Sequence, residues 1–146
     1  MAETMSKSGS CLCGGVRFSC SGVLKNVSAC HCEGCRKWGG GPYFAVKCGD
    51  DVAFDGEENI SIYESSDWAH RGFCKVCGSS LFYKFKETGE YRLSLGLFDN
   101  EDGLYLEQQY FVDAKSKVYT LDNKTKDFTT AEVFAMLKKT RNVNKK

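Results

Sequence analysis

The sequence predicts a mainly β, antiparallel, metal-binding domain with one short helix near its C-terminal end. The sheet is predicted by short apolar runs of period two that are separated by turn residues. Metal binding is predicted by nine cysteines, most of which fall into short-spaced clusters. With 146 residues, 42% of them hydrophobic, the chain is long enough to bury a core of its own.

Seven segments alternate apolar and polar residues, as strands with one buried face do. They run from Val16 to Cys20, Tyr43 to Val46, Ile60 to Ile62, Leu81 to Phe85, Tyr91 to Leu97, Gln109 to Val112 and Val118 to Leu121. Chain reversals are marked by Asp55-Gly56, by Thr88-Gly89 and by the stretch from Asp99 to Gly103. Such short connections favour antiparallel pairing over βαβ units.

A helix is predicted to begin after Thr129. Thr129 and Glu132 have the spacing of a capping box, in which each side chain satisfies a backbone N–H of the other residue. An apolar stripe and the basic last turns follow, at Val133, Phe134, Leu137, Lys138, Lys139 and Arg141. This pattern is typical of an amphipathic helix whose cations lie near its negative end.

The cysteines form three clusters and leave two single residues. The clusters are Cys11 with Cys13, Cys30 with Cys32 and Cys35, and Cys74 with Cys77, and the single residues are Cys20 and Cys48. Cysteine makes up about 6% of the chain, below the level of a disulfide-stapled secreted scaffold. The opening residues lack the apolar segment of a secretory signal, so we expect a cytoplasmic protein with reduced thiols. Clustered thiols then indicate metal binding rather than disulfides or buried apolar cysteines.

The spacing of the clusters predicts how they divide between metal ions. Thiolate ligands favour zinc, which takes four protein ligands at a structural site and three at a catalytic site. Joining the two pairs predicts a closed structural zinc site, and the triplet remains as a three-thiolate zinc site with a vacant position. We call the first set (Cys11, Cys13, Cys74 and Cys77) the four-cysteine cluster and the second (Cys30, Cys32 and Cys35) the three-cysteine cluster.

The local geometry needed at these clusters is simple. Cysteines two apart on an extended strand project to one side, so Cys11 with Cys13 and Cys30 with Cys32 can each share an ion. The pair at Cys74 and Cys77 needs a tight turn instead, which a positive φ at the following residue, Gly78, permits.

The vacancy at the three-cysteine cluster has competing interpretations. Cys20, Cys48 or His31 can each supply a fourth ligand, although a side chain at position 31 of a strand faces away from its neighbours. Cys20 also continues the apolar row of Val16 and Phe18, which favours a place in the core. We expect residues 9–141 to form a single zinc-binding β domain, with a disordered N-terminus over residues 1–8 and a basic tail over residues 142–146.

Charge excludes two classes of partner. Twenty basic against nineteen acidic residues give a net charge of +1, which provides no field for holding nucleic acid or an anionic membrane surface. No apolar run approaches the roughly 20 residues of a membrane span. We therefore expect neither nucleic acid nor membrane as a partner.

The order of the cysteine motifs resembles the glutathione-dependent formaldehyde-activating enzyme family, whose domain is shared with centromere protein V. The matching stretches are Gly9 to Val16, Ala29 to Cys35, Tyr63 to Leu81 and Tyr110 to Asp113. The resemblance implies a β-tent (Mss4-like) fold. It also implies a structural zinc on the four-cysteine cluster and a catalytic zinc on the three-cysteine cluster, whose Cys30, Cys32 and Cys35 are then the catalytic residues.

The same resemblance implies a zinc-dependent carbon–sulfur lyase that uses two zinc ions. Its partners would be glutathione, or a similar small thiol, and formaldehyde or another small aldehyde, joined or separated as S-(hydroxymethyl)glutathione. The alternatives are a non-catalytic zinc domain that carries glutathione or binds a protein, and a thioredoxin-like redox module at Cys74 and Cys77. The redox module ranks last, because it requires βαβ units.

Several side chains near the three-cysteine cluster are candidates for its surroundings. Arg36 and Lys37 can offset the negative charge of three thiolates or bind a substrate carboxylate, or they can be solvated surface cations. A glycine run and two aromatic residues can line a pocket, and the two histidines can carry a proton. These are Gly39, Gly40, Gly41, Trp38, Tyr43, His31 and His70.

Overall fold

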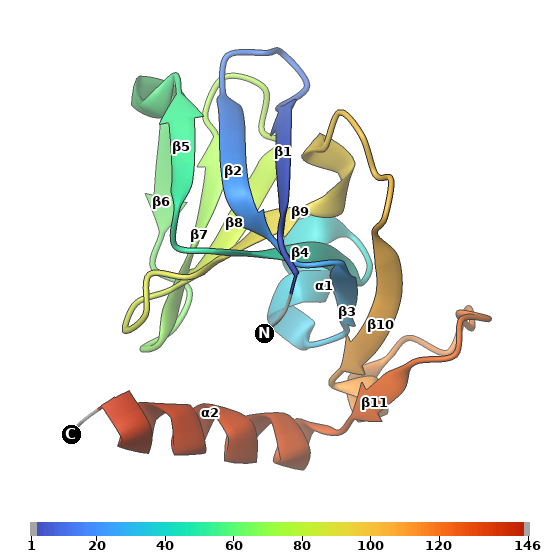
Figure 1. Cartoon of the computed structure of the whole chain (residues 1–146). Helices are drawn as coiled ribbons and strands as arrows, with labels where there is room; N and C mark the ends of the chain where they lie inside the picture. Colours follow the sequence, from blue (N-terminus) through green and yellow to red (C-terminus); the bar gives the residue numbers. More distant parts are fainter. Residues whose placement is uncertain (1–2, 145–146) are drawn as a thin grey trace. The chain divides into compact units, whose positions relative to one another are not determined.

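The structure is a computed structural model that describes residues 3–144, with the side chains of residues 3–139. Over these residues the chain forms eleven β-strands and two α-helices, which confirms the expected mainly β fold with a C-terminal helix (Figure 1). No helix in this part of the chain has both the length and the apolar character that a membrane crossing requires. The chain divides into two compact units, unit 1 with residues 3–27 and Ala45–Tyr105, and unit 2 with Ser28–Phe44 and residues 106–144.

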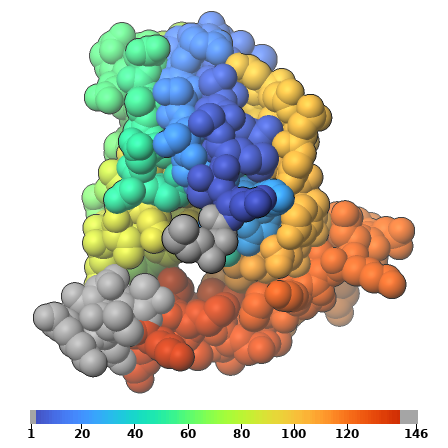
Figure 2. All heavy atoms as spheres, viewed as in Figure 1, coloured from blue at the N-terminus to red at the C-terminus, as the bar shows by residue number. Residues whose placement is uncertain are grey.

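The first sheet of unit 1 is antiparallel, with the strand order β1-β2-β5. Its strands are β1 (Met5–Ser10), β2 (Arg17–Val23) and β5 (Val52–Asp55). In the space-filling view the blue atoms of β1 and β2 lie side by side (Figure 2). Along β2, Phe18 and Cys20 are buried and Ser19 and Ser21 are exposed, as its period-two pattern predicts.

The expectation of a disordered N-terminus over residues 1–8 is corrected for residues 5–8, which belong to β1. The segment is polar and has no apolar alternation that would predict a strand. It is held instead by backbone pairing with β2, for example at Gly9 opposite Phe18. A Cβ at Gly9 would lie 2.0 Å from the carbonyl oxygen of Leu97, so the strand needs glycine at this position. Residues 1–2 lie outside the described residues.

The remaining strands of unit 1 follow one another in the order β4-β9-β8-β7-β6, with antiparallel neighbours. They are residues 45–49 of β4 (Tyr43–Gly49), β9 (Tyr91–Ser94), β8 (Ser80–Phe85), β7 (Ala69–Cys74) and β6 (Ile60–Tyr63). Gly72 on β7 lies opposite Phe82 on β8, and a Cβ at Gly72 would lie 2.2 Å from the Phe82 ring. The glycine therefore admits this ring, which packs against Phe54 and Tyr91 in the core.

Unit 2 contains strands in the order β11-β10-β3 and both helices. The elements are β3 (Asn26–Cys30), α1 (Glu33–Gly39), β10 (Tyr105–Tyr110), β11 (Lys126–Phe128) and α2 (Thr130–Asn144). The parallel pairing of β10 with β11 was not predicted. The predicted capping box is confirmed, because the Thr129 N–H donates to Glu132 Oε1 at 3.0 Å and the Glu132 N–H donates to Thr129 Oγ1 at 3.3 Å.

Six of the seven predicted strand segments correspond to observed strands, with shifted ends. The observed strands are β2, β4, β6, β8, β9 and β10. β9 ends at Ser94, where the 3-10 turn Leu95–Leu97 replaces the predicted continuation. β10 ends at Tyr110, because Phe111 adopts a φ of 59° that no strand residue has. The predicted reversals at Gly56, Gly89 and Gly103 all have positive φ.

The strand predicted from Val118 to Leu121 is wrong, because this segment is irregular. The Lys115 ammonium binds the carbonyl oxygens of Ser116 and Tyr119, which folds the chain back on itself there. At the other end of unit 2, residues 142–144 of the expected tail belong to α2, and residues 145–146 lie outside the described residues. The assignment of residues 9–141 to a single domain stays a prediction.

Candidate metal centres

The four-cysteine cluster lies entirely in unit 1. Its Sγ atoms all lie within 4.8 Å of one another, as the sequence spacing predicted. The Sγ of Cys13 lies 3.6 Å from that of Cys11 and 3.8 Å from that of Cys74. A tetrahedral zinc ion with Zn–S bonds of about 2.3 Å requires sulfur separations of about 3.8 Å. The cluster therefore has the donor set and the spacing that fit zinc.

Two tight turns bring these cysteines together. Cys11 and Cys13 lie in the turn between β1 and β2, rather than on the extended strand that the sequence predicted. The backbone N–H groups of Val16 and Gly15 donate to the sulfurs of Cys11 and Cys13, at 3.3 and 3.4 Å. The second turn begins with Cys74 at the end of β7, and Gly78 closes it with a φ of 80°, as predicted.

The thiols of this cluster have pKa values that move in opposite directions. The side chain and the backbone N–H of Ser79 lower the pKa of Cys77 to about 5. At Cys13 the Gly15 N–H lowers the pKa, but the neighbouring thiol of Cys11 and those of the other cysteines raise it, to about 11 overall. Thiolates this close repel one another, so a divalent cation is the partner that allows all four to be deprotonated.

The three-cysteine cluster lies in unit 2, at the junction between β3 and α1. Cys30 is the last residue of β3, Cys32 is the N-cap of α1, and Cys35 lies in the first turn of this helix. Their Sγ atoms also lie within 4.8 Å of one another. Cys32 Sγ accepts a hydrogen bond from the Cys35 N–H at 3.3 Å, so the helix cap itself holds two of the sulfurs together.

The environment of these three thiols also fits a metal ion. The pKa of Cys30 is raised far above its usual range, because its thiol is hydrogen-bonded to those of Cys32 and Cys35 and is buried. Three adjacent thiolates are therefore unfavourable without a cation. With a divalent ion the centre carries one net negative charge, so a nearby cation such as Arg36 stabilises it.

His31, considered as a fourth ligand, instead uses both ring nitrogens elsewhere. Its side chain is fully buried, with Nε2 2.8 Å from Gln109 Oε1 and Nδ1 3.1 Å from the Tyr119 hydroxyl. The sequence predicted that His31 faces away from the cluster. In the described part of the chain, the side chains that converge there are Cys30, Cys32 and Cys35, without His31. It forms the centre of a hydrogen-bond network in unit 2.

The donors and acceptors of this network can be assigned starting from Asp127, whose carboxylate can only accept a hydrogen bond. The Gln109 amide nitrogen donates to Thr125 Oγ1 at 2.9 Å, and this hydroxyl donates to Asp127 Oδ1 at 2.5 Å. Gln109 therefore turns its oxygen toward His31, which donates from Nε2 and accepts at Nδ1 from the Tyr119 hydroxyl. Burial raises the pKa of this phenol, and the positive charge of Arg36 opposes that rise. The phenol consequently stays protonated and donates.

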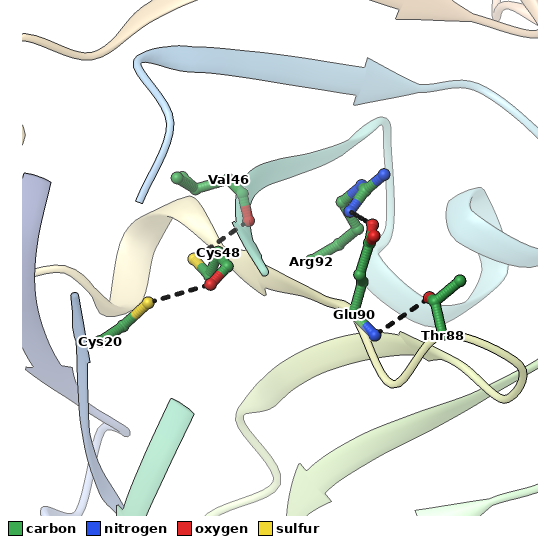
Figure 3. A network of polar contacts seen from close by, with 6 residues as sticks. All are labelled: Cys20, Val46, Cys48, Thr88, Glu90 and Arg92. Carbon is green, nitrogen blue, oxygen red and sulfur yellow. Dashed lines mark hydrogen bonds and ion pairs between the residues drawn. The ribbon is translucent and has the colours of Figure 1, made fainter. Parts of the chain in front are cut away.

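The other two candidate ligands lie in unit 1, Cys20 on β2 and Cys48 on β4, and Cys20 contacts the strand that carries Cys48 (Figure 3). Cys20 Sγ donates to the Cys48 carbonyl oxygen at 3.2 Å, and Cys48 Sγ donates to the Val46 carbonyl oxygen at 3.3 Å. The Cys48 thiol lowers the pKa of Cys20 to about 7. Both side chains are buried, so they occupy the core position that the apolar row of β2 predicted for Cys20.

A pocket of about 790 Å³ is hollowed in unit 2 along α1 and the irregular segment after η3 (Val112–Ala114). Its lining consists of Glu33, Arg36, Lys37, Gly40, Gly41, Pro42, Phe44, Ser116, Val118, Tyr119 and Leu121. This volume is within the range of small-molecule sites. Sequence reasoning identified Arg36, Lys37 and two of the glycines, but it missed the wall formed by residues 116–121, because these residues were assigned to a strand.

Three other residues that the sequence suggested for the surroundings of the three-cysteine cluster are Trp38, Tyr43 and His70, and none of them lines the pocket of unit 2. Trp38 and Tyr43, considered as pocket walls, pack against each other with ring centroids 5.2 Å apart and are not part of the lining. His70 lies in unit 1, where its Nδ1 is 3.7 Å from Glu64 Oε1. Neither the sequence nor this contact assigns His70 a catalytic role.

Known proteins resemble the chain over most of its length. The family described as glutathione-dependent formaldehyde-activating enzyme matches residues 6–114. An uncharacterized lyase of Schizosaccharomyces pombe is 33% identical over 132 residues, covering 90% of this chain and 96% of that protein. A putative glutathione-dependent formaldehyde-activating enzyme of Halomonas elongata is 35% identical over 83 residues, covering 51% of this chain and 53% of that protein.

A solved structure shares the fold. The crystal structure of a Rhodobacter sphaeroides protein matches with a TM-score of 0.57 at 21% identity, covering 84% of this chain and 99% of that one. The likeness concerns the fold alone. The family match extends over well over half of the chain and includes both cysteine clusters. The chain therefore belongs to the glutathione-dependent formaldehyde-activating enzyme family.

Proposed function

We propose that this protein catalyses the reversible addition of glutathione to formaldehyde, forming or cleaving S-(hydroxymethyl)glutathione as a carbon–sulfur lyase. A similar small thiol or aldehyde fits the same chemistry. The observation that carries the proposal is the three-cysteine cluster, because its three sulfurs converge on the helix that also lines the pocket of unit 2. The family match and the name of the Halomonas relative support the choice of substrates.

Two zinc ions are part of this proposal. Cys11, Cys13, Cys74 and Cys77 would hold a structural zinc, and Cys30, Cys32 and Cys35 would hold a catalytic one. When bound to three protein ligands, zinc supplies a vacant coordination position that favours the thiolate form of a thiol. The convergent sulfurs and their perturbed pKa values support this assignment of ligands.

The proposed reaction is balanced without an oxidant or a reductant. The sulfur of glutathione adds to the carbonyl carbon of formaldehyde, a C–S bond forms and the C–O double bond becomes single. The proton lost by the thiol ends on the new hydroxyl group. The protein accelerates this addition by holding thiol and aldehyde together, which replaces a bimolecular encounter.

Residues of unit 2 give the pocket a fixed shape for this task. The Tyr119 hydroxyl, bound to the buried His31, fixes one wall, and the αL glycine that ends α1, Gly40, with a φ of 84°, lies in the lining. Side chains that are already held in place lose less entropy when a ligand binds.

Of the two alternatives, the non-catalytic domain is an outcome of the test and the redox module is not. A non-catalytic zinc domain would carry glutathione or bind a protein without accelerating the reaction. A redox module at Cys74 and Cys77 is opposed by geometry, because both sulfurs belong to the four-cysteine cluster. A cytoplasmic location and the absence of nucleic acid and membrane partners stay predictions.

The test is NMR exchange spectroscopy of formaldehyde with glutathione, using protein shown to contain two zinc ions. Acceleration over a protein-free control, lost in Cys35→Ser, supports the enzyme. Glutathione binding without acceleration supports the carrier instead. Absence of both binding and acceleration contradicts the proposal and favours a structural or interaction domain.

A further inference from the structure

We propose that the pocket of unit 2 is the subsite for a carboxylate-bearing arm of the thiol substrate, and that Arg36 is the residue that binds this carboxylate. This inference rests on the proposed function and names the class of thiol that the site selects. It predicts that the protein discriminates between thiols by a charged group remote from their sulfur.

The first supporting observation is the way Arg36 is held. Its Nε donates to the carbonyl oxygen of His31 at 3.2 Å, and the side chain is half-buried in the pocket lining. This bond orients the guanidinium and leaves its two terminal nitrogens for another partner. A guanidinium with both terminal nitrogens available matches the two oxygens of a carboxylate.

The second observation is the charge balance of the lining. Lys37 forms an i,i+4 ion pair with Glu33 at 3.0 Å, and both side chains are largely exposed. Among the side chains that the structure describes, no carboxylate forms an ion pair with Arg36. Within the described residues, Arg36 is therefore the cation of the pocket lining that has no carboxylate partner, whereas Lys37 is paired with Glu33.

The third observation is the opposite wall. The Tyr119 phenol is committed as a donor to His31, so it offers Arg36 no negative charge. Val118, Leu121 and Phe44 supply apolar surface to the same pocket. A ligand with a methylene or amide backbone and a terminal carboxylate would contact the apolar surface and also bind the Arg36 guanidinium. A small neutral thiol has no group that binds the guanidinium in this way.

The position of Arg36 in the chain connects this subsite to the sulfur chemistry. Arg36 directly follows Cys35, whose sulfur belongs to the three-cysteine cluster. The Arg36 Nε also bonds to the carbonyl oxygen of His31, which lies between Cys30 and Cys32, so this side chain lies against the segment that carries two of the three sulfurs. One molecule that carries both a thiol and a carboxylate, as glutathione does, would in this proposal engage the cluster and the guanidinium together. Binding energy from the carboxylate would then position the reacting sulfur.

The experiment compares two ligands on two variants, with zinc-loaded full-length protein. The ligands are glutathione and glutathione diethyl ester, which keeps the thiol and the peptide backbone but has no free carboxylate. Arg36→Gln retains side-chain N–H donors but loses the positive charge. Arg36→Lys retains the charge but loses the paired terminal nitrogens of the guanidinium. Arg17→Gln is the matched control, because Arg17 lies in unit 1 in an exposed ion pair with Asp99.

Dissociation constants from isothermal titration calorimetry are the main measurement, and zinc content is measured for every variant. We expect unmodified protein to bind glutathione about 10-fold more tightly than the diester, which is typical of one charge-assisted hydrogen-bonded pair. Arg36→Gln should remove this preference, Arg36→Lys should restore part of it, and Arg17→Gln should keep it. In exchange kinetics Arg36→Gln should raise KM for glutathione much more than it lowers kcat.

Equal affinity of unmodified protein for the two ligands would overturn the inference without any mutation. It is also overturned if Arg36→Gln weakens both ligands equally at unchanged zinc content. These results leave the proposed function intact if the exchange reaction is still accelerated. If zinc-loaded unmodified protein binds neither thiol, the proposed function fails and the subsite fails with it.

Discussion

The two cysteine clusters are built from the chain in opposite ways. The four-cysteine cluster joins two turns far apart in sequence, since Cys13 and Cys74 are 61 residues apart. The three-cysteine cluster is contained in six consecutive residues, from Cys30 to Cys35, at one strand-to-helix junction. A metal ion in the four-cysteine cluster would therefore close a long loop of the chain. A metal ion in the three-cysteine cluster would close only a very short one.

This difference predicts different energetic roles. Closing a long loop removes much of the conformational freedom of the unfolded chain, so the first ion would stabilise unit 1 as a whole. The residues of the second cluster are already held by β3, by the cap of α1 and by the bonds of His31. Its ion would therefore contribute less to folding and be available for chemistry.

The largest effect is expected from breaking the four-cysteine cluster. Cys74→Ser or Cys11→Ser should lose one zinc ion and most of the folded population. Metal binding at a site of four thiolates contributes on the order of 10 kcal/mol, comparable to the stability of a whole domain. Elemental analysis and thermal melts measure both quantities. A variant with full metal content and an unchanged melting temperature would contradict the comparison.

Breaking the three-cysteine cluster should have a smaller effect on folding. Cys32→Ser or Cys35→Ser should release the labile zinc ion and leave the fold largely intact. In Cys32→Ser the new hydroxyl can still cap α1, so the free energy of unfolding should change by about 1 kcal/mol or less. Zinc content under mild chelation, followed with the melting temperature, is the measurement. If both ions leave together, the division into structural and catalytic sites is wrong.

The grouping of the cysteines was predictable because it depends on local spacing. A Cys-x-Cys pair and a Cys-x-x-Cys-Gly turn determine which sulfurs converge, whatever the surrounding strands do, and the positive φ of Gly78 followed from the same pattern. The buried face of β2 and the capping box of α2 were predictable for the same reason. Each is encoded within a few consecutive residues.

Features that depend on distant contacts were not predictable. The polar strand β1 is held by backbone pairing with β2, which leaves no apolar pattern to detect. The apolar alternation from Val118 to Leu121 predicted a strand, but Lys115 folds this segment into a pocket wall. The bond between His31 and Tyr119 joins residues 88 apart in sequence, so the sequence offered no signal for their network.

The hydrogen-bond network around His31 offers a third test of the comparison. Tyr119→Phe removes the donor to the buried Nδ1 of His31, and Gln109→Leu leaves the buried Nε2–H unpaired. We expect unfolding free energies lower by about 1 kcal/mol and by about 1–3 kcal/mol, respectively. Tyr63→Phe, at an exposed tyrosine of unit 1, is the control.

Both network variants should also release the zinc ion of the three-cysteine cluster more readily to a chelator, because the turn that carries its ligands is less firmly held. Urea unfolding and chelator competition measure the two effects. Faster loss from the four-cysteine cluster, or no change at either one, would contradict the role given to His31.

The smallest expected effect concerns the hydrogen bonds between Asp113 and Thr130, the first residue of α2 in unit 2. The backbone N–H of Thr130 donates to Asp113 Oδ1 at 2.8 Å and its hydroxyl at 3.0 Å. These donors, the backbone N–H first, lower the pKa of Asp113. A carboxylate with a lowered pKa in the folded state stabilises that state at pH values above its unfolded pKa, about 3.9.

The stabilisation by Asp113 should therefore be constant near neutral pH and be lost as the pH falls below about 4. Asp113→Asn keeps an acceptor for Thr130 but removes the charge, so the difference in unfolding free energy between this variant and unmodified protein isolates the charge. The difference should be measurable at pH 7 and should vanish in acid. Asp102→Asn, on an exposed loop of unit 1, is the control for removing a surface charge. A difference for Asp113→Asn that is independent of pH would mean that the side chain acts only as a neutral cap of α2.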